Sequence, residues 1–185
     1  MRNSPTVLLA GALDTKSSDF RFVRDLLAAA GLRVIVADFG VLREPDWKPD
    51  VPAKSVAAAA GVALDQLRLD HDKAVAMRVM AEGLAATVVG LYENREIDAI
   101  LSLGGSSGTA IATAAMRCLP LGFPKVMVST VAGGHTSQYT GTRQQGSIAY
   151  IRQARAETTV LTPLSFLLNE VLNFLNQKRM PRRRY

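Results

Sequence analysis

Residues 98–109 read DAILSLGGSSGT, an apolar strand that runs directly into a loop of glycine, serine and threonine. An alanine-rich helix is predicted next, over residues 110–117. Very small side chains allow backbone N–H groups to gather around an anion at the start of a helix. The same residues also suit a tight strand-to-helix turn without a ligand. The stretch therefore predicts a strand–loop–helix unit and leaves phosphate binding and a plain turn both open.

A strand–helix–strand unit precedes it at the N-terminus. Residues 6–11 form a short apolar run typical of a buried strand. Apolar residues recur at helical spacing over residues 20–30, and residues 32–38 form a second strand. Residues 12–18, between the first strand and the helix, are interpreted as a polar loop. The short connections are typical of a right-handed parallel βαβ unit.

The rest of the chain continues the alternation of strands and helices. Residues 39–53 contain three prolines and are interpreted as a surface excursion. Helices are predicted over residues 55–60 and 73–94, a buried strand over 125–129 and a last helix over 163–177. The sequence therefore predicts the α/β class: a single domain with a Rossmann-like parallel sheet flanked by helices and with a C-terminal helix.

Composition and charge exclude several classes of protein. No apolar run reaches the roughly 20 residues of a membrane span and no signal peptide is recognisable, so we expect a cytoplasmic protein without a membrane partner. Residues 1–142 balance 14 Lys/Arg with 14 Asp/Glu, whereas residues 143–185 hold 8 Lys/Arg and 2 Asp/Glu and carry the whole net charge of +6. A basic tail without an aromatic platform argues against nucleic-acid binding. Two histidines and one cysteine argue against a dedicated metal site.

Three predicted strands end in small and polar residues, over residues 11–18, 104–109 and 129–136. In an open parallel sheet, ligands bind beyond the carboxyl ends of the strands. We therefore expect the three segments to share one rim that binds a phosphorylated or nucleotide ligand. Neither the Gly-x-x-x-x-Gly-Lys-Ser/Thr fingerprint nor the Gly-x-Gly-x-x-Gly fingerprint is present.

The segment Asp14-Thr15-Lys16 has two interpretations. Lys16 suits a phosphate, and Asp14 suits Mg²⁺ held through water. Alternatively, Asp14 or Thr15 caps the following helix. No catalytic residue is assigned, because His135 has no identifiable acid partner and residues 105–108 lack the spacing of a nucleophile elbow.

Residues 11–16, 103–109, 119–134 and 139–142 together resemble the Tm-one-like ATP-binding domain family. That family includes the N-terminal domain of a plant tobamovirus-resistance protein and many bacterial proteins. The resemblance implies a Rossmann-like domain that binds ATP, with or without Mg²⁺, and that often forms a homodimer. No reaction is firmly attached to the family.

The resemblance also implies which residues bind the ligand. They are Gly11, Asp14, Thr15, Lys16, Gly104, Gly105, Ser106, Ser107, Gly108, Thr109, Ser129, Thr130, Gly133, Gly134, Gly141 and Thr142. Ser107 departs from the family pattern, which has glycine there, and its hydroxymethyl group narrows the approach of a phosphate.

The likeness ends after Thr142, which divides the chain into two parts. Residues 1–142 are interpreted as the nucleotide-binding domain, and residues 143–185 as a divergent basic tail with one helix in place of the family's second domain. We hypothesise that the tail is truncated or frame-altered. Three functions fit: a module with a nucleotide ligand, an incomplete half of a two-domain enzyme of small phosphorylated or acyl substrates, and an oligomerisation or protein-interaction module.

Overall fold

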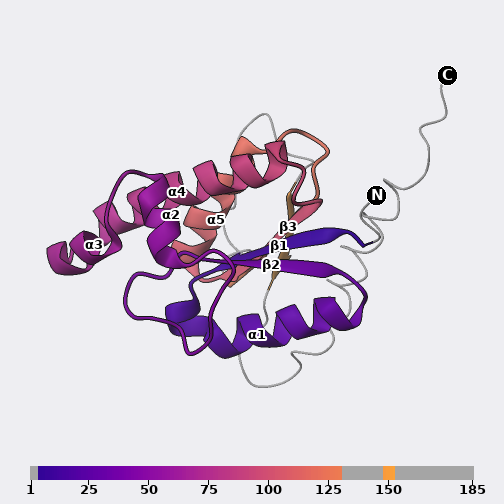
Figure 1. The fold of residues 1–185 in the computed structure, drawn as a ribbon, viewed down its shortest axis with the longest axis horizontal. Helices are drawn as coiled ribbons and strands as arrows, with labels where there is room; N and C mark the ends of the chain where they lie inside the picture. Colours follow the sequence, from indigo (N-terminus) through magenta and orange to yellow (C-terminus); the bar gives the residue numbers. More distant parts are fainter. Residues whose placement is uncertain (1–3, 131–147, 153–185) are drawn as a thin grey trace.

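A single parallel sheet forms the centre of the fold (Figure 1). The computed structural model describes residues 4–130 and 148–152. Five strands lie in the order β2-β1-β3-β4-β5, and all neighbouring pairs are parallel. The strands are β1 (Thr6–Gly11), β2 (Arg33–Asp38), β3 (Ala99–Gly104), β4 (Lys125–Ser129) and β5 (Ile148–Arg152). The predicted α/β class with a parallel sheet flanked by helices is confirmed.

Helices connect the first four strands. They are α1 (Leu13–Ala29), α2 (Ala53–Ala59), α3 (Leu64–Asp70), α4 (Lys73–Glu93) and α5 (Ser106–Cys118). Three details correct the sequence predictions. Residues 12–18 are not a loop, because α1 begins at Leu13. α5 begins at Ser106 rather than at residue 110. The elements α3 and β5 were not predicted. The helix predicted over residues 163–177 lies outside the described residues.

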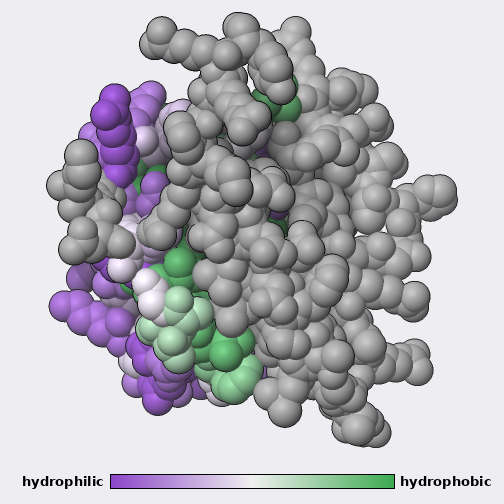
Figure 2. Space-filling model, turned by 90° about the vertical axis from the view of Figure 1, so that its right-hand side faces the viewer, coloured by the Kyte–Doolittle hydropathy of each residue, from purple (hydrophilic) through white to green (hydrophobic). Residues whose placement is uncertain are grey.

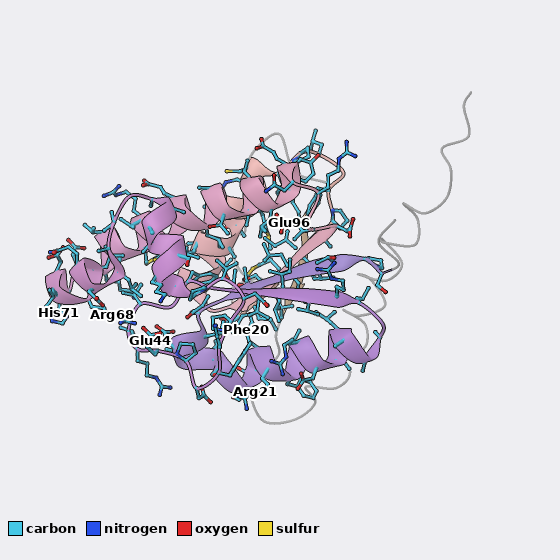
Figure 3. All side chains as sticks on the ribbon, viewed as in Figure 1. Phe20, Arg21, Glu44, Arg68, His71 and Glu96 are labelled. Atoms are coloured by element: carbon cyan, nitrogen blue, oxygen red, sulfur yellow. The ribbon has the colours of Figure 1, made fainter. Side chains whose placement is uncertain are left out.

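α1 covers one face of the sheet (Figure 1). Alternate residues of β1, such as Val7 and Leu9, point to this face and are fully buried. Phe20 and Leu27 of α1 pack onto them, and Figure 3 shows Phe20 between the helix and the sheet. A Cβ on Gly11 would collide with the ring of Phe20. Packing against Phe20 therefore explains why residue 11, which was predicted to contact a ligand, is a glycine.

α2, α4 and α5 cover the opposite face. Leu8 and Ala10 of β1 point to this side, where Met80 and Leu84 of α4 are also fully buried. By length and composition, α4 is the helix of the described residues that is apolar enough to cross a membrane. Its packing against α2, α5 and the core is the arrangement of a helix that belongs to a folded domain.

The surface of the described residues is mixed in character. On the face drawn in Figure 2, hydrophilic residues line one side and a group of hydrophobic residues lies next to them. The exposed large hydrophobic side chains come from different segments and are Phe22, Leu42, Leu69, Tyr92 and Leu121. Exposed apolar side chains of this kind are ordinary on globular proteins and do not by themselves define a site.

Candidate functional site

The carboxyl ends of β1 and β3 lie side by side where the winding of the chain reverses. β1 pairs with β2 on one side and with β3 on the other, where Ala10 is opposite Ser102. α1 follows β1 onto one face, and α5 follows β3 on the opposite face. In sheets with this strand order, ligands bind in the crevice at such a switch point. The candidate site is therefore built around the starts of α1 and α5.

The N-cap residue of α5 provides no side-chain hydrogen bond to the helix start. Gly105 is the N-cap residue, and the first helical hydrogen bond runs from the N–H of Thr109 to the carbonyl of Gly105, at 2.8 Å. The N–H groups of Ser106, Ser107 and Gly108 precede that bond and have no partner within the helix. These three residues are exposed or half-buried. A helix start of this kind is positively polarised and suits an anion.

Small residues allow α5 to start close to its strand. A Cβ on Gly104 would lie 3.1 Å from the Cα of Gly108, so a larger residue would push strand and helix apart. Among the described residues, a Cβ on Gly105 would meet Thr130 Oγ1, at 3.8 Å. The N–H of Thr130 donates to the carbonyl of Gly104 at 3.2 Å, which joins the end of β4 to the end of β3.

Two hydroxyl groups fix the first turn of α5 to β4. Thr109 Oγ1 and Ser129 Oγ are buried and lie 2.6 Å apart. Thr113 Oγ1 donates to the carbonyl of Thr109 at 2.7 Å. The structure thus brings the predicted residues Thr109, Ser129 and Thr130 together with Gly104 and Gly105. Thr109 and Ser129 act by positioning the helix start.

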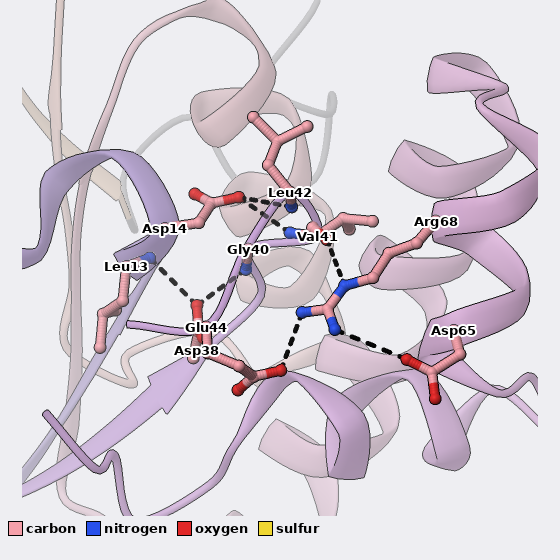
Figure 4. A network of polar contacts seen from close by, with 9 residues as sticks. All are labelled: Leu13, Asp14, Asp38, Gly40, Val41, Leu42, Glu44, Asp65 and Arg68. Carbon is pink, nitrogen blue, oxygen red and sulfur yellow. Dashed lines mark hydrogen bonds and ion pairs between the residues drawn. The ribbon is translucent and has the colours of Figure 1, made fainter. Parts of the chain in front are cut away.

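The start of α1 is different, because the side chain of Asp14 is used inside the protein. Asp14 lies in the first turn and is 4% exposed. Its Oδ2 accepts hydrogen bonds from the N–H groups of Val41 and Leu42, each at 2.9 Å (Figure 4). The N-cap residue is Ala12, without a side-chain hydrogen bond. The alternative in which Asp14 or Thr15 caps the helix is therefore wrong.

Asp38, the last residue of β2, satisfies the first N–H of α1. Its Oδ1 accepts from Leu13 at 3.0 Å and from Gly40 at 2.8 Å (Figure 4). Burial raises the pKa of Asp38 from 3.8 to about 6, although the hydrogen bonds from Gly40 and Leu13 lower it; the charge of Asp14 adds to the increase. Keeping Asp38 ionised at neutral pH therefore lowers the stability of the folded protein.

Asp14 keeps one oxygen without a partner. Oδ1 is buried and makes no hydrogen bond. Gly40 packs directly against this carboxyl group: a Cβ on Gly40 would lie 2.6 Å from Asp14 Cγ and 2.8 Å from Oδ1. The absence of a side chain at residue 40 therefore allows the segment after β2 to approach α1.

Thr15 and Lys16 lie at the surface of α1. The backbone of Lys16 leaves helical geometry, with φ −131° and ψ 28°, so the first turn of α1 is bent relative to the remainder. Lys16 Nζ is 3.9 Å from Asp19 Oδ2, and the Lys16 side chain is 37% exposed. Thr15 Oγ1 makes a long contact of 3.5 Å to the carbonyl of Ala12. Lys16 is thus accessible, in contrast to Asp14.

An arginine holds the segment after β2 from the other side. Arg68 of α3 donates from Nε to the carbonyl of Val41 at 2.8 Å, and its Nη atoms contact Glu44 at 2.8 Å and Asp65 at 3.5 Å (Figure 4). Figure 3 shows Arg68 and Glu44 near the end of the domain where α3 lies. Asp14 and Arg68 together fasten residues 41–44 between α1 and α3.

Arg43 also belongs to this region, because its Nε donates to the main-chain carbonyl of Asp14 at 2.7 Å. The sequence predictions missed Asp38, Arg43 and Arg68. An acidic residue at the end of a strand followed by glycine, as in Asp38-Phe39-Gly40, was the available signal for the first. Gly133, Gly134, Gly141 and Thr142 lie outside the described residues. Among the residues that are described, no three His, Cys, Asp or Glu side chains form a group that could hold a metal ion.

The fold and this helix start define an α/β domain with its candidate site at the switch point of a parallel sheet. Residues 5–146 match the N-terminal domain of an uncharacterised protein family, UPF0261. The chain therefore belongs to the UPF0261 family.

Relatives come from bacteria and from a plant. A UPF0261 protein of Clostridium tetani is 44% identical over 135 residues, which are 73% of this chain and 33% of the relative. A UPF0261 protein of Brucella suis is 39% identical over 72% of this chain and 32% of its own length. The ToMV resistance protein Tm-1(GCR237) of Solanum lycopersicum is 29% identical over 76% of this chain and 21% of its own length. The match to this chain spans about a third of the bacterial relatives.

Proposed function

We propose that this domain binds a nucleotide at the switch point, with ATP as the leading candidate. The observation that carries the proposal is the uncapped start of α5, where three N–H groups precede the first helical hydrogen bond. Phosphate oxygens are the acceptors that such a helix start favours, because they combine negative charge with several lone pairs. Gly105, Ser106, Ser107 and Gly108 surround the proposed phosphate position.

ATP is preferred to other phosphates because of the motifs over residues 11–16, 103–109 and 119–134, which resemble an ATP-binding family. The similarity to the tomato ToMV resistance protein Tm-1 supports that resemblance. Magnesium enters this proposal bound to the phosphates of the nucleotide, since the described residues offer no group of three ligands for a metal ion.

A thermal-shift titration of the full chain tests the proposal. A ligand that binds only the folded protein stabilises it by RT ln(1 + [L]/Kd), about 2.7 kcal/mol at a hundredfold excess over Kd. ATP with Mg²⁺ should raise the melting temperature progressively with concentration, and adenosine should not. An unchanged melting temperature at millimolar ATP would contradict nucleotide binding.

A second function is favoured by the length of the relatives. Because the match covers 33% of the clostridial protein, we also propose that this domain is an incomplete part of a two-domain enzyme whose active site the second domain completes. Turnover of small phosphorylated or acyl compounds by the full-length clostridial protein, and its loss in a version cut to the matched third, would support this function. Equal activity of both versions would argue against it.

A module for self-association is the remaining proposal. The predicted helix over residues 163–177, which lies outside the described residues, would then join two copies of the chain. Light scattering of the chain with and without residues 160–185 measures this directly. A monomer in both cases would eliminate a homodimer formed in this way.

A further inference from the structure

Two buried carboxylates hold the segment that follows β2. Asp14 is 4% exposed and Asp38 is 1% exposed. Asp38 Oδ1 accepts the N–H of Gly40, and Asp14 Oδ2 accepts the N–H groups of the next two residues (Figure 4). Gly40 touches both groups, since a Cβ on it would lie 2.6 Å from Asp14 Cγ. In the closed position of residues 40–44, which we call the strap, both carboxylates are therefore shielded from water.

Among the residues that the structure describes, no cation forms an ion pair with either carboxylate. Arg43 donates to the main-chain carbonyl of Asp14 rather than to its carboxyl group. Arg68 forms its ion pairs with Glu44 and Asp65. Asp14 Oδ1 is buried and makes no hydrogen bond. Two negative charges that are buried with N–H partners alone destabilise the closed strap when both are present.

The charged groups around Asp38 are mainly acidic. Burial raises the pKa of Asp38 to about 6, the hydrogen bonds from backbone N–H groups lower it, and the charges of Asp14 and Glu44 add to the increase. On the outer side of β2, Asp50 accepts the N–H of Val36 at 2.8 Å. β1 brings no charged side chain, because its sequence is TVLLAG. The acidic neighbours therefore outweigh the arginines of the strap and of α3 at this carboxyl group.

We propose that the strap is a pH-sensitive fastening, which is firmly closed while Asp38 holds a proton and is loosened when Asp14 and Asp38 are both ionised. A proton on Asp38 Oδ2 leaves the two hydrogen bonds to Oδ1 in place. Opening of the strap hydrates both carboxylates and so relieves the burial of two negative charges. The inference concerns the start of α1 and does not depend on nucleotide binding at α5.

The direction of the pH dependence follows from the affinity of Asp38 for its proton. With the strap closed, the pKa of Asp38 is about 6, whereas the ordinary value is 3.8. The closed state therefore binds the proton more tightly than an open state in which Asp38 meets water. The preference for closure is full below pH 3.8 and is lost as the pH rises through about 6.

Hydrogen exchange of the full chain between pH 5 and pH 8 tests the proposal. With the intrinsic exchange rate divided out, the protection of the Gly40, Val41 and Leu42 amides should fall about tenfold across that range, because opening restores part of the ordinary acidity of Asp38. Leu84 of α4 is fully buried and reports global unfolding. Low concentrations of urea should reduce the protection of Leu84 but not that of the strap, since a local opening exposes little surface.

Variants assign the effect to the two carboxylates. Asp38→Asn cannot ionise, so protection of the strap should not depend on pH and should exceed that of the unmodified chain at pH 8. Asp14→Asn removes the second charge, so the fall in protection should be smaller and should shift to lower pH. Histidines also change charge between pH 5 and pH 8. The control is therefore His71→Asn combined with His135→Asn, which should leave the fall unchanged.

The outcomes distinguish a local fastening from a global effect. A fall in protection that low urea does not change and that Asp38→Asn abolishes supports the proposal. Constant protection of the strap, a fall that follows Leu84 in urea, or a fall that persists in Asp38→Asn overturns it. If Asp38→Asn does not fold, Asp14→Asn decides: a smaller fall at lower pH supports the proposal, and an unchanged size and midpoint of the fall overturn it.

Discussion

Helices α1 and α5 start at the same end of the sheet, but only the start of α1 has carboxylates from the described residues beside it. At α1, the first N–H donates to the buried carboxylate of Asp38, and the first turn contains Asp14. At α5, the first turn contains no acidic residue, and the N-cap residue Gly105 provides no side-chain hydrogen bond. Negative charge is favoured at both helix starts. The protein supplies that charge itself at α1 and leaves the start of α5 open.

This difference changes the interpretation of the polar strand ends. Asp14 was predicted to face a ligand, yet its Oδ2 holds residues 41 and 42. Gly104 and Gly105, in contrast, leave the N–H groups of the next three residues without a helical partner. Similar strand-end sequences can therefore fasten a segment of the protein in one case and leave backbone N–H groups without a helical partner in the other.

Gly40→Ala should have the largest effect on stability, because the added methyl group would collide with the carboxyl group of Asp14. The added Cβ would lie 2.6 Å from Asp14 Cγ, and such overpacking costs about 3 kcal/mol of unfolding free energy. Urea denaturation measures the change. Gly90→Ala is the control: a Cβ there meets nothing within 4 Å and should stabilise α4 by about 0.5–1 kcal/mol. Equal behaviour of the two variants would show that residue 40 does not pack as described.

Asp14→Ala should destabilise the protein by about 2 kcal/mol, since it removes the acceptor of two backbone N–H groups. Asp14→Asn keeps one oxygen for both donors and should cost less. Hydrogen exchange should increase at Val41 and Leu42 in the alanine variant but not in the asparagine variant. Unchanged exchange at both amides would show that the Asp14 carboxylate does not hold this segment.

Asp38→Asn should stabilise the protein at neutral pH. The folded protein binds the Asp38 proton more tightly than the unfolded chain does, because the folded-state pKa is about 6 and the ordinary value is 3.8. The contribution of this group to stability is therefore full below pH 3.8 and is lost as the pH rises through 6. A shift of two units corresponds to roughly 3 kcal/mol, of which the amide should recover about 1 kcal/mol.

Denaturation of both proteins between pH 4 and pH 8 provides the measurement. The stability difference between Asp38→Asn and the unmodified chain should grow across that range and level off above pH 7. A difference that does not depend on pH would mean that Asp38 titrates at its ordinary value.

Gly105→Asp should have the smallest effect on stability and a clear effect on binding. The new carboxylate caps α5 as Asp72 caps α4, and a gain of about 0.5 kcal/mol is expected. The same carboxylate occupies the proposed phosphate position, so the stabilisation by ATP should disappear. Ala63→Asp adds an equivalent cap to α3 and should leave ATP binding unchanged. Retained ATP binding in Gly105→Asp would place the ligand elsewhere.

The elements were predictable where side-chain patterns report directly on burial. Apolar runs over residues 6–11 and 125–129 marked β1 and β4, since strands of a parallel sheet are buried on both faces. Helical spacing marked α4, because one side of it packs on the core. α3 escaped prediction because it is one short segment of seven residues, in which buried Leu64 and Leu67 make too brief a pattern.

The candidate site was predictable only in part. The residues after β3 were identified because glycine and serine at a strand-to-helix junction have a direct physical meaning. Arg43 and Arg68 carried no such signal, since an isolated arginine in a polar segment has the same local sequence whether it is free or paired. Their roles depend on contacts with residues 29 and 27 positions away, Asp14 and Val41.

The sequence by itself determined the α/β class, the parallel arrangement and the small-residue junction after β3, because periodicity and residue size act locally along the chain. Only the tertiary structure decided which of the two helix starts receives a carboxylate from another described element. The carboxylate of Asp38 reaches α1 from the neighbouring strand β2, and the segment after β2 closes over Asp14. The pairing of strands far apart in the chain therefore determines whether the polar groups at a strand end find partners within the described part of the protein.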